Sequence, residues 1–204
     1  MTVKTLSRAA FLAGFSGLMT GPAFAHHVMG GQMPATFADG LLSGLGHPVI
    51  GLDHFAAVVA VGALAAAHRA GGWLAAGFVL AMMAGVAIHL LGAPLPGAEI
   101  WVALSVVALG AVLAARGDMS AGAAVALFAC TGLLHGYALG ESIYGAEPTP
   151  LAAYLIGLAV IQSAIALAAM KIARLVTQRD MRPIRYAGAA IAVVGLAALA
   201  QPFI

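Results

Sequence analysis

Long apolar segments, separated by short polar or glycine-containing turns, dominate the pattern of this chain. Six of them have about 17–22 residues, the length an α-helix needs to cross a hydrocarbon core of about 30 Å. None alternates between apolar and polar residues as the strands of a membrane barrel do. We predict an all-α, polytopic membrane helix bundle with six transmembrane helices at residues 48–67, 73–91, 99–115, 121–139, 151–172 and 185–203. A short helix or re-entrant segment is predicted before them, at residues 36–46.

The first 25 residues have the pattern of a cleaved secretory signal peptide. Lys4 and Arg8 form a basic start, an apolar run follows, and Ala23-Phe24-Ala25 matches a small-x-small cleavage site. A retained first helix is the alternative. Cleavage divides the chain into a signal peptide, residues 1–25, and a six-helix transmembrane domain, residues 26–204. It also places His26 and His27 beside a free α-amine, where they either capture a metal ion or form an ordinary solvated tail.

Composition and charge placement support the membrane assignment. The chain is 63% hydrophobic and 8% charged, whereas soluble domains carry about 25% charged residues. Loops 68–72, 116–120 and 173–184 hold or adjoin every basic residue after the signal segment: Arg69, Arg116, Lys171, Arg174, Arg179, Arg182 and Arg185. Since basic residues concentrate in cytoplasmic loops, we expect a bacterial inner-membrane protein whose mature N- and C-termini are both periplasmic. The same bias explains the pI near 9.0 without a nucleic-acid partner.

Ionisable residues gather in the outer halves of the predicted helices. His47 is expected to cap a helix that begins at Pro48, with His54 on the same face and about 10 Å deeper. Asp53 directly precedes His54, and the fourth helix carries His135. Such groups are costly in hydrocarbon, so their clustering indicates a functional site. Imidazole and carboxylate are donors that divalent transition metals prefer, and the single cysteine excludes a Cys-based metal cage.

Three further ionisable residues lie at the outer ends of the same helices. His89 ends the second helix, Glu99 begins the third and Glu141 ends the fourth. Each has an alternative reading, as a histidine bonded to a backbone carbonyl or as an interfacial helix cap. Glycines at 132, 136 and 140 predict a close packing face, which would draw the two histidine-bearing helices together.

Two motifs resemble those of a known family of membrane proteins. The run His47–His54, a His followed by five residues and Asp-His, is similar to the first signature of the HupE/UreJ family. The run His135–Glu141 resembles the second, His-Gly-x-Ala ending in Gly-x-Glu, with Tyr137 where a smaller residue is common. The stretch Leu95–Ser105 is also similar to the family, and the resemblance covers essentially the whole mature chain.

The resemblance implies a secondary permease that imports Ni²⁺, in some members Co²⁺, from periplasm to cytoplasm for nickel enzymes such as hydrogenase or urease. Such a protein is not an enzyme and holds no tightly bound cofactor. Its partners are the divalent metal substrate and the lipid bilayer, and a homo-oligomer is compatible with the sequence. The implied metal-binding residues are His47, Asp53, His54, His135 and Glu141, with His26, His27, His89 and Glu99 as further candidates.

Two other classes of protein use the same residue types. An intramembrane zinc-dependent hydrolase would hold zinc with histidines and activate water. A b-type haem electron carrier would use His54, His89 or His135 as axial ligands, although the nearby carboxylates do not suit an apolar haem pocket.

Overall fold

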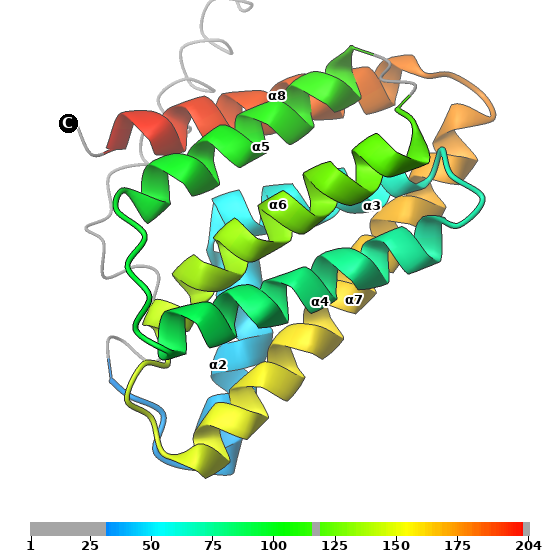
Figure 1. The fold of residues 1–204 in the computed structure, drawn as a ribbon. Helices are drawn as coiled ribbons and strands as arrows, with labels where there is room; N and C mark the ends of the chain where they lie inside the picture. The colour runs from blue at the N-terminus through cyan, green and yellow to red at the C-terminus, as the bar shows by residue number, and fades with distance from the viewer. Residues whose placement is uncertain (1–31, 116–118, 202–204) are drawn as a thin grey trace, which may run out of the picture.

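The structure is a computed structural model that describes residues 32–115 and 119–201. The predicted signal peptide, His26 and His27 lie outside the described residues. Within them the chain forms seven α-helices and no strands (Figure 1). The helices are α2 (Phe37–Ile50), α3 (Leu52–Ala65), α4 (Gly71–Leu90), α5 (Ala98–Ala114), α6 (Ala121–Glu141), α7 (Pro148–Thr177) and α8 (Arg182–Ala200).

The prediction of a polytopic helical membrane protein agrees with the length and composition of these helices. Four of them, α4, α6, α7 and α8, are long and apolar enough to cross a membrane, and α2 with α3 qualifies as a fifth span if the bent pair is counted as one. The remaining helix, α5, is apolar but has only 17 residues. Five predicted segments therefore coincide with helices, while six spans remain a prediction.

The predicted first span at residues 48–67 is wrong as a single helix. The chain breaks at Gly51, where α2 and α3 meet at an angle of 78°. Gly51 has an extended backbone (φ −72°, ψ 102°), and its N–H bonds to the carbonyl of His47. Asp53 accepts a hydrogen bond from the backbone N–H of His54, so a carboxylate stabilises the new helix start. His47 consequently lies in the last turn of α2 and does not cap a helix, and α2 extends the short helix predicted at 36–46 to Ile50.

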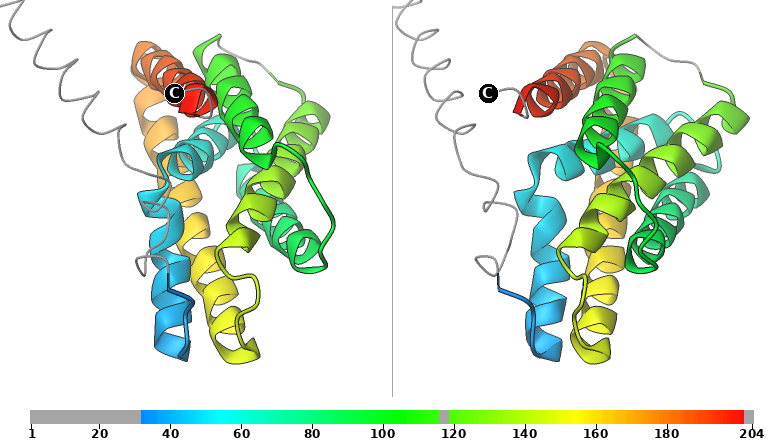
Figure 2. Two further views of the ribbon diagram at one scale, coloured as in Figure 1. Left: turned by 90° about the vertical axis from the view of Figure 1, so that its left-hand side faces the viewer. Right: turned by 60° about the vertical axis from the view of Figure 1, so that its left-hand side comes forward.

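Helix pairs pack through small residues that let the backbones approach closely. The pairs α2 with α7, α4 with α6 and α5 with α8 lie side by side (Figures 1 and 2). A Cβ added to Gly132 would lie 2.6 Å from the carbonyl oxygen of Phe78, and one added to Gly140 would lie 2.8 Å from Cβ of His89. The glycine face of α6 thus packs against α4. Our expectation that it would face the first histidine-bearing helix is wrong, because glycine spacing predicts close packing but not the partner.

The basic residues mark one end of the bundle. Arg174 donates hydrogen bonds to the carbonyls of Ala66 and His68, beyond the end of α3, and Arg185 donates to the carbonyl of Ala114 at the end of α5. These bonds join the ends of α3, α5 and α7 with the start of α8. We call this the basic end; α4 and α6 also begin there (Figure 1).

Candidate metal site

Three predicted histidines converge where the chain breaks between α2 and α3. His54 in the first turn of α3 and His135 of α6 face each other through their Nδ1 atoms, which are 2.7 Å apart. The ring of His47, from the last turn of α2, has its centroid 5.8 Å from that of His54. All three side chains are buried, and His135 has no exposed surface. The break therefore brings together imidazoles that a straight helix would hold about two turns apart.

Ser105 of α5 completes this cluster and was not among the predicted site residues. Its hydroxyl lies 2.7 Å from the carbonyl oxygen of Val102 and 3.0 Å from Nε2 of His135. A hydroxyl has one hydrogen, and the shorter distance is typical of O–H···O, the longer of N–H···O. Ser105 therefore donates to Val102 and accepts from Nε2–H of His135. The available signal was a lone hydroxyl residue within the apolar segment 99–115.

This hydrogen-bond chain fixes the tautomers of both histidines. With its proton on Nε2, neutral His135 presents a bare Nδ1, the lone pair that a metal ion needs. His54 must then donate Nδ1–H across the 2.7 Å contact, because two bare nitrogens would repel each other. Nε2 of His54 is left as its lone-pair nitrogen. Ser105 acts here as the orienting partner that ligating histidines commonly have.

Gly51 provides space for an imidazole edge, a carboxylate and a carbonyl to meet. A Cβ built on Gly51 would lie 3.0 Å from Cδ2 of His54, 3.3 Å from Oδ1 of Asp53 and 3.4 Å from the carbonyl oxygen of His47. A single methyl position is therefore bordered by groups from three of the predicted metal-binding residues. Carboxylate and carbonyl oxygens together with imidazole nitrogens form a donor set that suits a divalent cation.

The other predicted site residues lie away from this cluster, at the end of the bundle opposite the basic end. Glu99 and Glu141 are exposed. His89 packs edge-on against Tyr137 and Tyr144, with ring centroids 4.6 and 5.7 Å away. Within the described residues no contact joins Glu99 or Glu141 to the histidines, so these two carboxylates at helix ends are not part of the buried cluster.

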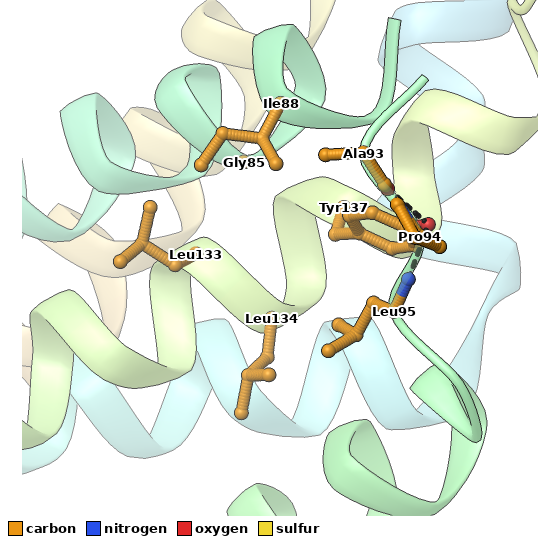
Figure 3. Close-up of a pocket in the computed structure, with 8 residues that line it drawn as sticks. All are labelled: Gly85, Ile88, Ala93, Pro94, Leu95, Leu133, Leu134 and Tyr137. Carbon is orange, nitrogen blue, oxygen red and sulfur yellow. Dashed lines mark hydrogen bonds between the residues drawn. The ribbon is translucent and has the colours of Figure 1, made fainter. Parts of the chain in front are cut away.

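Tyr137 ties the loop between α4 and α5 to α6. Its hydroxyl donates to the carbonyl of Ala93 (2.9 Å) and accepts from the N–H of Leu95 (3.0 Å). A pocket of about 230 Å³ lies beside this contact (Figure 3). It is lined mainly by apolar side chains from α4, α6 and the loop: Gly85, Ile88, Ala93, Pro94, Leu95, Leu133, Leu134 and Tyr137. Its lining lacks the donors that a metal ion requires, so the candidate metal site is the buried cluster.

The cluster is not a closed metal cage in this conformation. In the described part of the chain, no three His, Cys, Asp or Glu side chains are arranged to hold one ion together. Metal–imidazole bonds of about 2.0–2.1 Å put two nitrogens on one ion about 3 Å or more apart. For one ion to bind both Nδ1 atoms, the 2.7 Å contact between His54 and His135 must widen by several tenths of an ångström, and the Nδ1 proton of His54 must leave or move to its Nε2.

Comparison with known proteins assigns the chain to a family. No solved structure matches it. Protein HupE of Rhizobium leguminosarum bv. viciae is 36% identical over 123 residues, which cover 58% of this chain and 61% of that relative. The family model described as HupE / UreJ protein matches residues 13–198. This match spans most of the sequence, including both histidine motifs, helices α2 to α7 and most of α8, and the chain therefore belongs to the HupE/UreJ family.

Proposed function

We propose that this protein is a secondary permease that imports Ni²⁺, with Co²⁺ as a second substrate, for nickel enzymes such as hydrogenase or urease. The observation that carries the proposal is the direct contact of His54 with His135 at a break in an apolar helix pair, with His47 beside them. Ionisable groups at such a position mark substrate or ion pathways in membrane proteins. Transporters commonly build their sites from broken helices of this kind.

The substrate site we propose consists of His47, Asp53, His54 and His135. Imidazole and carboxylate suit Ni²⁺ and Co²⁺, whereas Cu(I) selects thiolate and thioether ligands. Glu141, with His89 and Glu99, is assigned to the approach path at the outer end, together with His26 and His27 of the segment that precedes the described residues. A contact that must open to admit an ion favours weak, reversible binding, which transport requires.

The proposed orientation follows from the basic end. We place it in the cytoplasm and count α5 and the bent pair as spans, which gives six spans in the inner membrane after a cleaved signal peptide. The bonds from Arg174 and Arg185 to helix ends support this, because both cations lie where the positive-inside rule expects them. Both mature termini are then periplasmic, and the permease domain is residues 26–204.

The geometry does not favour either alternative class. A haem iron between two axial histidines needs space for a porphyrin, and the contact between His54 and His135 leaves none between these two rings. A zinc hydrolase needs three protein ligands and an open position for water. The same four residues of the proposed substrate site would have to supply these ligands, and the family match favours a permease over a hydrolase. We therefore propose that the protein is not an enzyme.

Uptake of radioactive nickel and cobalt tests the proposal. Cells that lack their own importers would express wild type, His54→Ala, His135→Ala and the control His68→Ala at matched membrane levels. His68 lies in the loop after α3, outside the cluster, so the same substitution there should leave uptake unchanged. We expect both cluster variants to lose accumulation. If well-expressed wild type accumulates neither metal, the permease assignment is wrong, and bound zinc and hydrolase activity become the next assays.

A further inference from the structure

A second group of buried polar side chains lies between the histidines and the basic end. It consists of Met82 of α4, Thr131 of α6 and Gln162 of α7, and we call it the neutral layer. Gln162 has no exposed surface, and Thr131 and Met82 are each 1% exposed. The side-chain amide of Gln162 donates a hydrogen bond to the thioether sulfur of Met82. None of these side chains carries a charge, so a search for ionisable residues passes over them.

The helix contacts place Thr131 and Gln162 one turn from the histidines, toward the basic end, and Met82 beside them, since its backbone packs against Gly132 and Gly136 of α6. Thr131 precedes His135 by one turn of α6, which begins at the basic end. Gly62 of α3 packs against the backbone of Ala166 of α7. Because α3 and α7 both end at the basic end, Gln162, one turn before Ala166, lies beyond the level of His54.

Two oxygens of the neutral layer are buried without a partner. Neither Oε1 of Gln162 nor Oγ1 of Thr131 has a hydrogen-bond partner among the residues that the structure describes. A buried polar atom left unbonded destabilises the fold, and native proteins keep few of them. A leucine and a valine of similar shape would fill the same positions without that cost. The polar atoms therefore have a role that packing alone does not explain.

We propose that Met82, Thr131 and Gln162 form a second, weaker binding position through which the divalent cation passes from the histidine cluster toward the basic end. This inference rests on the proposed function. Amide and hydroxyl oxygens and a thioether sulfur bind a cation without a formal charge, and hence less strongly than imidazoles beside a carboxylate. Conduction requires that a bound ion can also leave its site. A second position of lower affinity next to the histidines would let the ion leave them in steps.

The test compares Gln162→Leu and Thr131→Val with the matched controls Gln178→Leu and Thr177→Val. The controls make the same chemical changes at the basic end, outside the layer. Initial uptake rates of nickel at several concentrations, nickel binding to the purified protein, and thermal unfolding would be measured for each. We expect the layer variants to lower the maximal rate on the order of tenfold, with unchanged nickel affinity at the histidines. Their unfolding temperatures should equal or exceed that of wild type, because an unbonded polar atom has been removed.

The outcomes separate this inference from the proposed function. If wild type neither takes up nor binds nickel, the proposed function fails and the inference fails with it. If wild type transports nickel and the layer variants match their controls, only the inference is overturned. A layer variant that loses uptake together with unfolding temperature would show a structural role, for instance through an ordered water bridging the two oxygens, and would also overturn it.

Discussion

Replacing Gly136 by alanine tests the close approach of α4 and α6. The added Cβ would overlap the carbonyl oxygen of Met82 and lie 2.7 Å from its carbonyl carbon and 2.8 Å from its Cα. These are backbone atoms, so no side-chain rotation relieves the clash. Ordinary contact begins at 3.4 Å, so the helices must separate by more than the roughly 0.7 Å that would relieve the contact with the carbonyl carbon, because the carbonyl oxygen lies closer still. Overpacking of this kind costs about 1–3 kcal/mol, which corresponds to a fall in Tm of about 2–12 °C for a chain of this size.

The matched control is Gly77→Ala on α4. A Cβ at Gly77 would meet no atom within 4 Å, and alanine is favoured over glycine in a helix by about 1 kcal/mol. Thermal unfolding of both variants in the same detergent should therefore give a lower Tm for Gly136→Ala and an equal or higher Tm for Gly77→Ala. If the two variants unfold at the same temperature, the helices do not approach as closely as the structure indicates, and the reasoning is refuted.

Two further substitutions address the break and its surroundings. Gly51→Ala adds a methyl group 3.0 Å from Cδ2 of His54 without backbone strain. Nickel uptake should therefore fall about tenfold, with little change in Tm. Unimpaired uptake would argue against a substrate site at the break. Tyr154→Phe removes the 2.9 Å hydrogen bond that the Tyr154 hydroxyl donates to the carbonyl of Leu139. Since Ser142 still donates to that carbonyl, the cost should be about 1 kcal/mol in thermal unfolding, and a much larger loss would show that the carbonyl is left unbonded.

The helices α4 to α8 were predictable because hydropathy and turn residues act locally. Gly71, Gly97 and Pro148 stand near the starts of helices, where the chain must change direction. The length of α7, 30 residues, was underestimated because its last turns carry Lys171 and Arg174 and so leave the apolar pattern. The break at Gly51 was missed because apolar residues continue on both sides of it.

The residue types of the site were predictable, but their contacts were only partly so. We predicted that His47 and His54 share one helix face because we assumed a continuous helix. The two side chains approach each other because the chain bends at Gly51, and the hydrophobic periodicity does not predict that bend. Ser105 was overlooked because a single serine in an apolar helix is common, and its importance comes from the partner it meets on another helix. Glu141 was grouped with the histidines by motif, yet it is exposed at the end of α6.

The position of the break supports the site independently of residue chemistry. Irregular backbone at membrane depth is tolerated only where protein buries it or where it lines a cavity, and Gly51 is buried. Beyond His54, the α3 residues Ala57, Val58 and Val61 have no exposed surface and pack as an ordinary apolar helix. If this segment served only to span the membrane, we would expect one continuous helix through residue 51. Local rules tend to fail where function imposes another geometry, and here the departure falls between the two histidines that it brings together.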